Sequence, residues 1–155
     1  MPLLQPTLGF VLHDVARLLR KRFEQRARDL GLTRSQWQCL AFLAPNEGIH
    51  QGGLAEILEV EPITLGRILD KLEARGLIER RSHPTDRRIR LLYLTPDALP
   101  LLDQMRELGD VTRAEALEGL SDPDRERLMG MLTHIKRNLV SACGKPVRMK
   151  EARHG

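Results

Sequence analysis

Apolar residues recur at steps of three and four over residues 8–30, a spacing that places them on one face of an α-helix. Gly31 follows this run, and glycine is the residue that most often ends a helix in a left-handed conformation. The pattern therefore predicts a long amphipathic helix. Thr33 and Gln36 then have the spacing of a capping box, which predicts a second helix ending near Ala44.

Two shorter helical segments come next, separated by only three residues. Apolar positions predict the first over residues 51–58, and Pro62, whose fixed φ suits the first helical position, predicts the second over residues 62–75. Gly76 is placed to end this helix. Two short helices in this arrangement are typical of a helix-turn-helix, whose second helix enters the major groove of DNA with its N-terminal end.

The pattern then changes to short β-like runs over residues 77–81 and 89–95, joined by a turn sequence, which predicts a hairpin. A fifth helix is predicted to end near Leu117, with Pro100 making its first turn irregular or delaying its start. Ser121 has the character of an N-cap for a last helix.

These elements predict a mainly α-helical fold with one small β-hairpin, that is, a winged helix-turn-helix. Residues 1–142 are expected to form a single domain made of a DNA-binding lobe at 48–95 and dimerisation helices at 8–30 and 97–141. The polar, basic residues 143–155 are expected to form a flexible tail.

The composition is that of one globular domain, with 155 residues of which 41% are hydrophobic and 30% charged. No run reaches the roughly 18 apolar residues that a membrane-spanning helix needs, so we expect a cytoplasmic protein without a membrane partner. Cys39 and Cys143 are too few for a disulfide framework, and the five histidines are scattered. Because phosphate-binding and nucleophile motifs are also lacking, we expect no enzyme activity, metal or cofactor.

Charge is concentrated in the helix-turn-helix and hairpin, where eight Lys or Arg residues oppose four acids over residues 62–95. This excess of four equals the net charge of the whole chain. Arg67, two turns into the second helix, is a candidate for a bidentate contact with a guanine edge. Thr64 is a candidate for a contact with a phosphate or a base edge. Pro62 and Gly66 are rigid or small and would let the helix approach the DNA closely.

Arg87 and Arg88 lie at the turn of the hairpin, from which arginines can extend into a minor groove. Asp86 would repel phosphate, so we interpret it as a brace that pairs with Arg88 and shapes the loop. Two alternatives remain open. The hairpin is either a solvated charged surface, or part of a winged helix that binds protein, although such an adaptor would not need three arginines around its tip.

Several motifs together carry a family resemblance: Gln51-Gly52-Gly53-Leu54-Ala55, Thr64-Leu65-Gly66-Arg67, Leu72-Glu73-Ala74-Arg75-Gly76-Leu77-Ile78-Glu79-Arg80, and Asp86-Arg87-Arg88 before Leu94-Thr95. With them, the chain resembles the MarR (multiple antibiotic resistance regulator) family, particularly its SlyA-like branch. The resemblance implies a homodimeric transcriptional regulator, more often a repressor, that binds a palindromic operator. It also implies that a small anionic, commonly aromatic, ligand lowers the affinity for DNA.

By this resemblance Arg67 is the recognition-helix arginine, Arg88 the wing arginine and Asp86 the wing brace, and Gln51 joins the DNA contacts. His50 stands where the family often has a threonine or another polar residue, so a hydroxyl cap is not expected at this helix start. A dimer also has a physical motive, because the first and last helices carry apolar stripes that a small head cannot cover. The alternative is a compact monomeric bundle.

Four residues on the first two helices are candidates for the ligand site: His13, Arg17, Trp37 and Leu40. An arginine beside aromatic and apolar groups suits an aromatic carboxylate such as a salicylate-like compound. The alternative is core packing for Trp37 and solvated faces for His13 and Arg17. Cys39 offers a different mode of control, a redox switch, although free cysteines are usually buried small hydrophobes.

Overall fold

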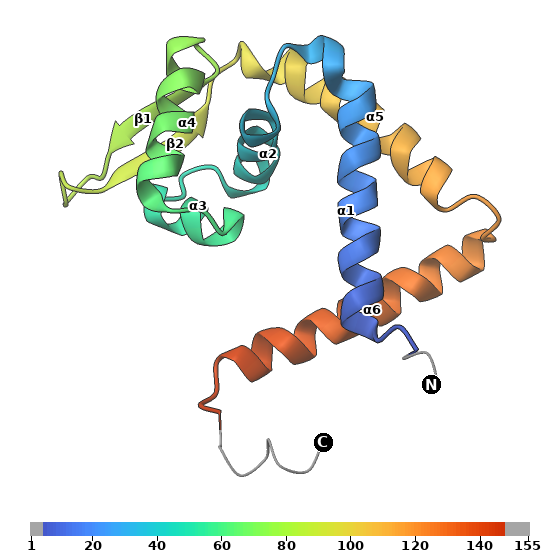
Figure 1. Ribbon diagram of the computed structural model, residues 1–155. Coiled ribbons are helices and arrows are strands. Elements are labelled where there is room, and N and C mark those ends of the chain that lie inside the picture. The colour runs from blue at the N-terminus through green and yellow to red at the C-terminus, as the bar shows by residue number, and fades with distance from the viewer. Residues whose placement is uncertain (1–4, 148–155) are drawn as a thin grey trace. The chain divides into compact units, whose positions relative to one another are not determined.

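The computed structural model describes residues 5–147, and Figure 1 shows their helices and the β-hairpin. By its internal contacts the chain divides after Ala114 into two compact units. The elements, in chain order, are α1 (Leu8–Arg26), η1 (Ala27–Leu30), α2 (Arg34–Leu43), η2 (Ala44–Asn46), α3 (Gln51–Leu58), α4 (Pro62–Ala74), β1 (Ile78–Ser82), β2 (Arg90–Leu94), α5 (Ala98–Ala116) and α6 (Asp122–Cys143).

The predicted first helix is present, but its last turn tightens into the 3₁₀ helix η1. Gly31 ends it with φ of 68°, a left-handed conformation that glycine adopts without steric cost. The capping box is also present, because the backbone N–H of Gln36 donates to the Thr33 hydroxyl and that of Thr33 to the Gln36 side chain. Thr33 thus fixes where α2 starts.

The two helices α3 and α4 form the predicted helix-turn-helix, with Pro62 as the first residue of α4. On the inner face of α4, Leu65, Leu69 and Leu72 are fully buried and anchor the helix in the core. The two helices approach closely at Gly66, where a Cβ atom would lie 3.3 Å from the Gln51 side-chain nitrogen. Gly66 therefore allows the contact that sets α4 against the start of α3.

The hairpin pairs β1 and β2 in antiparallel register, with Ile78 opposite Leu94 and Arg80 opposite Leu92. A segment that the sequence did not predict runs along the other edge of β2. There, Gly48 N–H donates to the Leu92 carbonyl at 2.8 Å, and Leu92 N–H donates to the Ile49 carbonyl at 2.9 Å. This short edge ties the loop before α3 to the hairpin and so fixes the hairpin beside the helix-turn-helix.

One core holds this first unit together. Its members are the buried side chains Cys39, Leu40, Leu43, Leu54, Ala55, Leu65, Leu69, Leu72, Leu77, Ile78, Leu92 and Ala98. They come from α2, α3, α4, the hairpin and the start of α5, so the outward faces of α4 and of the hairpin are held by one packed interior.

Helix α5 begins at Ala98 and includes Pro100 in its first turn. At this start the N–H groups of Ala98 and Leu99 donate to the carbonyls three residues earlier, at 3.1 and 3.2 Å, so the first turn is irregular as expected. Proline is tolerated there because the first N–H groups of a helix have no intrahelical acceptor. In the second unit, Ser121 caps α6 by accepting from Asp124 N–H, as predicted. Arg125 adds bonds of 3.0 Å to the carbonyls of Leu117 and Leu120 and closes the preceding turn.

None of the helices within residues 5–147 is long and apolar enough to cross a membrane. Of the tail expected at 143–155, residues 148–155 lie outside the described residues, while Cys143 is the last residue of α6.

Candidate nucleic-acid interface

The outward face of α4 is polar and basic, opposite the face that the buried leucines anchor. Thr64, Arg67 and Lys71 lie at helical spacing on this side and are exposed. They line a groove of about 330 Å³ whose other wall is the start of α2, formed by Thr33, Ser35, Gln36. The groove thus combines two cations with hydroxyl and amide groups, a set that suits a phosphate or a base edge.

Of this groove, the sequence analysis identified Thr64 and Arg67 but missed Lys71 and the α2 residues. Lys71 follows Arg67 by four positions, which places both on one helical face, and this spacing was the available signal. The contribution of α2 could not be read in the same way, because it depends on tertiary packing between α2 and α4.

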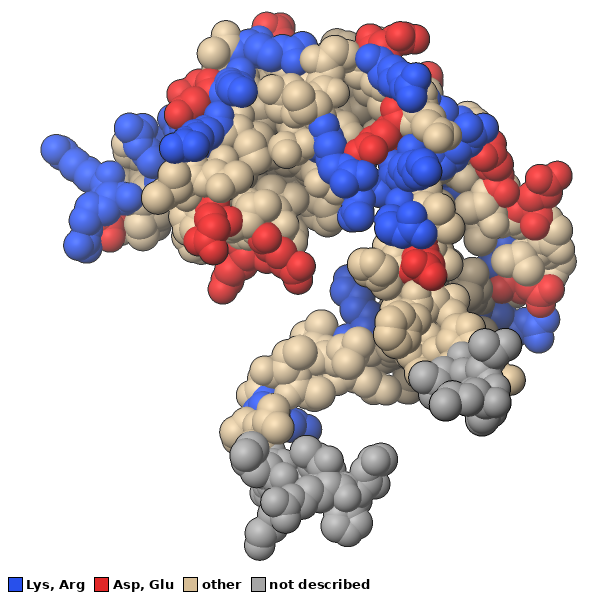
Figure 2. All heavy atoms as spheres, in the orientation of Figure 1, with Lys and Arg blue, Asp and Glu red and all other residues tan. Residues whose placement is uncertain are grey.

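The hairpin tip is the second basic element, and Figure 2 shows basic side chains, which in the hairpin are arginines, extending from the left of the molecule. Asp86 accepts from the backbone N–H of Arg88 at 3.0 Å and from its guanidinium at 3.2 and 3.3 Å. His83 Nδ1 accepts from the N–H groups of Thr85 and Asp86, both at 3.2 Å. The contact expected of Asp86 is therefore present. Arg87 is exposed, and the Arg88 side chain is 90% exposed, so both are accessible to a partner.

Hydrogen bonds from the Arg88 side chain and backbone lower the pKa of Asp86 below its usual value of 3.8. A carboxylate with a lowered pKa in the folded state stabilises the fold above its unfolded pKa, and this contribution is lost as the pH falls through the folded value. The brace is thus fully formed at neutral pH and is lost only in acid.

Not every cation counted in the sequence faces outward. Arg75 donates to the Gly31 carbonyl at 2.9 Å, and Arg81 pairs with Glu79 while its guanidinium lies 4.0 Å from the centre of the Tyr93 ring. Arg80 turns toward α4, with only 15% of its side chain exposed. Arg75 and Arg81 are exposed but are held by these contacts, and Arg80 is largely enclosed. The charge excess of the sequence therefore overstates the basic surface, to which Arg67, Lys71, Arg87, Arg88 and Arg90 also contribute exposed side chains.

At the start of α3, Gln51 is half-buried and lies against Gly66, as described above. His50 is the N-cap and makes no side-chain cap bond, in agreement with the expected lack of a hydroxyl cap. A Cβ on Gly53 would lie 3.0 Å from the His50 ring, so glycine at this position leaves room for the ring over the first turn of α3.

The four predicted ligand residues are not brought together. Leu40 is fully buried in the core: helical spacing places it near Trp37 but cannot show how deeply it lies. His13 and Arg17 are exposed on α1, and Arg17 lies 3.6 Å from Asp14. Trp37 packs on Phe23 with ring centroids 4.5 Å apart.

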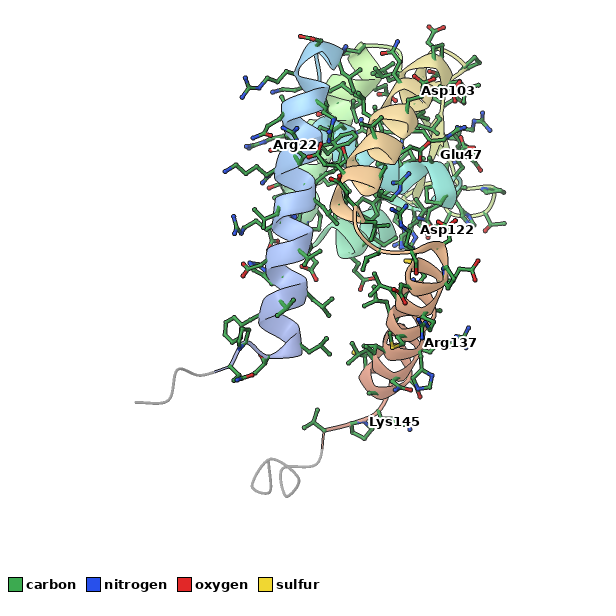
Figure 3. The ribbon with its side chains drawn as sticks, turned by 90° about the vertical axis from the view of Figure 1, so that its right-hand side faces the viewer. Arg22, Glu47, Asp103, Asp122, Arg137 and Lys145 are labelled. Atoms are coloured by element: carbon green, nitrogen blue, oxygen red, sulfur yellow. The ribbon has the colours of Figure 1, made fainter. Side chains whose placement is uncertain are left out.

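Trp37 instead borders a cavity of about 530 Å³ formed by α1, α2, β2 and α5. Its apolar wall consists of Phe23, Trp37, Ala41, Ala44, Leu94, Leu99, Leu102 and Met105. Four charged groups border the same cavity: Glu47, Asp103, Arg106 and Arg113, of which Figure 3 labels Glu47 and Asp103. The cavity has the apolar wall and the few charged groups that are typical of a small-molecule site.

Cys39 is fully buried, and burial raises the pKa of its thiol to about 12. Because the thiolate is the reactive form, this thiol is inert at neutral pH, which argues against the redox switch considered from the sequence.

Treatment with hydrogen peroxide is accordingly expected to leave DNA binding unchanged in a Cys143→Ser variant, where Cys39 is the remaining cysteine. Mass spectrometry of the Cys39 peptide should find the unmodified thiol, and a DNA titration should give the same affinity before and after treatment. Loss of binding together with an oxidised Cys39 would contradict the assignment.

Comparison with known proteins places these features in context. A sequence model described as MarR family matches residues 30–89, which run from η1 to the tip of the hairpin. The transcriptional regulator PA3341 is 31% identical, with a TM-score of 0.76 over 87% of this chain and 99% of its own. Wild-type MarR from E. coli is 25% identical, with a TM-score of 0.75 over 84% of this chain and 97% of its own.

A third similar structure, CouR, is described as a transcriptional repressor bound to a 23-mer DNA duplex. It is 29% identical, with a TM-score of 0.70 over 84% of this chain and 92% of CouR.

Proposed function

Because the chain belongs to the MarR family of DNA-binding transcriptional regulators, we propose that it is a homodimeric repressor that binds a palindromic operator. The observation that carries this proposal is the arrangement of its exposed cations. Arg67 and Lys71 lie on the outward face of α4, and Arg87 and Arg88 lie at the hairpin tip, while neighbouring arginines pair within the lobe.

In this proposal α4 enters the major groove, where Arg67 donates to a guanine edge and Pro62 and Thr64 lie against the bases. Lys71 and Gln51 contact the phosphate backbone, together with Ser35 across the groove. The wing, which we define as residues 82–90, reaches the neighbouring minor groove through Arg87 and Arg88, with Asp86 as its brace. CouR, a similar repressor, has been observed on duplex DNA, which supports this mode for a related chain.

An apolar stripe on α1 supports the homodimer. Leu8, Val11, Val15 and Leu18 lie at steps of three and four and are 46–56% exposed. Monomeric proteins rarely leave a stripe of this kind in water, since burying it against a second copy is favourable. Twofold pairing would present two α4 helices to two half-sites about one DNA turn apart, roughly 34 to 36 Å, which is why we propose a palindromic operator.

The cavity beside Trp37 supports control by a small anionic aromatic ligand. Arg106 and Arg113 are paired with Asp103 and Asp110, but these pairs are largely exposed and so are worth little. A carboxylate ligand can therefore replace an aspartate while its ring contacts the apolar wall. In one form of the dimer the two α4 helices would be spaced wrongly for the operator. A ligand that binds this form more tightly than the DNA-binding form lowers operator affinity by the difference between its two binding free energies.

Calorimetry with salicylate and other aromatic acids tests this part, and an Arg106→Ala variant should reduce the heat of binding. Absence of heat with the parent across such a panel would remove the ligand from the proposal and leave the DNA-binding function standing.

The function itself is tested by selecting bound sequences from a random duplex library at about 150 mM salt, where binding from charge alone is weakened. A palindrome bound much more tightly than a scrambled duplex is the expected result. If no sequence is enriched, and the protein binds all duplexes with the same salt-dependent affinity, the proposal of an operator-specific regulator fails.

Arg88→Ala is expected to weaken binding to operator and scrambled duplexes by similar factors, because a wing arginine interacts mainly with backbone charge and groove potential. The magnitude of the slope of log affinity against log salt concentration should fall by about one unit, the amount expected for the loss of one phosphate contact. Arg81→Ala is the matched control, because Arg81 is paired with Glu79 and packed on Tyr93. Equal losses in the two variants would contradict the assignment of the contact to the wing tip.

A further inference from the structure

Arg80 lies in β1 and spans the space between the hairpin and α4. One terminal nitrogen of its guanidinium donates to the Asp70 carboxylate at 2.7 Å, and the other donates to the Gly66 carbonyl at 3.0 Å. Glu73 adds a contact of 3.4 Å to the guanidinium and accepts from the Arg80 backbone N–H at 3.2 Å. One side chain of the hairpin is thus bonded to two successive turns of the recognition helix.

These contacts depend on the shape of the arginine side chain as well as on its charge. The guanidinium is planar, so two bonds from its two terminal nitrogens determine both the distance and the angle of β1 relative to α4. The side chain of Arg80 is 15% exposed and that of its neighbour Arg81 is 55% exposed. Arg80 is therefore much more deeply enclosed than Arg81. Two residues after Arg80, the chain enters the wing that carries Arg87 and Arg88.

We propose that Arg80 is a positioning residue that holds the wing in register with α4, so that Arg67 and Arg88 engage DNA at the same time. This inference rests on the proposed function, in which α4 and the wing occupy different grooves. A protein that already holds both contacts at the correct spacing avoids the entropy cost of ordering the wing on binding.

The same contacts explain why α4 carries an acid beside its DNA-reading face. Asp70 is 68% exposed and one turn from Arg67, where an unpaired carboxylate would repel phosphate. Paired with Arg80, it serves as the anchor of the strand. Asp70 thus supplies the acceptor that Arg80 needs on α4.

A double-substitution cycle with the parent, Arg80→Ala, Arg88→Ala and the double variant tests the inference through operator affinity and its salt dependence. We expect Arg80→Ala to weaken binding about tenfold, the size of a typical coupling between contacting groups. We also expect the loss caused by Arg88→Ala to be much smaller in the Arg80→Ala background, because a wing out of register no longer uses Arg88.

Two other roles of Arg80 predict different cycles. If Arg80 itself contacts a phosphate, the two losses multiply, and the double variant loses about one further unit of salt slope. If Arg80 only stabilises the fold, Arg80→Ala lowers the melting temperature while the folded protein binds as the parent does and Arg88→Ala keeps its full effect. Either pattern overturns the inference.

Arg80→Lys separates geometry from charge. Lysine keeps the positive charge near Asp70 but lacks the planar fork, so it is expected to behave like alanine in the cycle. Full operator affinity in Arg80→Lys, with the Arg88→Ala loss restored, would show that neutralising Asp70 is sufficient and would overturn the positioning role.

Hydrogen exchange without DNA keeps this test separate from that of the proposed function. The N–H groups of His83 and of residues 85–89 should exchange faster in Arg80→Ala than in the parent, and the Arg81→Ala control should resemble the parent. Unchanged exchange in Arg80→Ala would overturn the inference whatever DNA the protein binds. If the parent selects no operator while the exchange difference is present, the proposed function fails and the clamp between β1 and α4 stands.

Discussion

Replacing Val15 by glutamate is expected to convert a dimer into a 17.7 kDa monomer and to remove specific operator binding. Val15 is 48% exposed at the middle of the α1 stripe. In a twofold interface the same residue is contributed by both copies, so one substitution places two carboxylates in an apolar contact. Burying an unpaired charge costs several kcal/mol, which is enough to shift a typical dimer to monomer at micromolar concentration.

Val15→Glu should weaken operator binding more than the removal of any single DNA contact does. A dimer holds its second half-site contact at high effective concentration, and separating the halves removes a gain of roughly 10² to 10⁴ in affinity. Sedimentation equilibrium and a titration with the selected operator measure the two effects on the same samples.

His13→Glu is the matched control for this experiment. It introduces the same charge two residues earlier, which on an α-helix is close to the opposite face, and His13 is exposed. We expect this variant to keep the mass of a dimer. A Val15→Glu protein that also sediments at twice the chain mass would show that the α1 stripe is not the interface.

Local signals were sufficient to predict most of the fold. The capping box at Thr33, the proline that starts α4 and the glycine after it each act within a few residues, so their positions could be read directly. The edge at residues 48–50 was missed because its only signal is a partner more than forty positions away, at Leu91 and Leu92.

The site was predicted less completely, because residue type does not give the direction of a side chain. Asp86 and Arg88 are two positions apart in a turn, so their pairing depends on nearby residues alone and could be predicted from the sequence. Arg80 belongs to the same run of arginines, yet it turns inward because Asp70 and Glu73 lie opposite it on α4. The burial of Leu40 was not predicted for a related reason, since its depth is set by the packing of α3 and α4 against α2.

Arg67→Ala is expected to reduce the preference for operator over scrambled DNA by about 1 to 3 kcal/mol, the usual worth of a bidentate contact between arginine and guanine. Affinity for scrambled duplexes should change little, since the proposed base contacts of Arg67 would form in the specific complex only. Titrations of both duplexes at several salt concentrations measure this difference. Substituting the guanine opposite Arg67 should cost the parent the same amount and the variant almost nothing, which identifies the contacted base.

Lys71→Ala provides the contrast, because Lys71 lines the same groove one turn further along α4. A lysine on phosphate should lose affinity for all duplexes alike and lower the salt slope by about one unit. If Arg67→Ala also loses affinity for all duplexes alike, Arg67 contacts the phosphate backbone of the DNA, next to the residues at the start of α2. Sequence would then have to be read by residues nearer the N-terminus of α4, of which Thr64 is the one in the same groove with a hydrogen-bonding side chain. The pair of variants therefore decides whether this groove reads bases or holds phosphate.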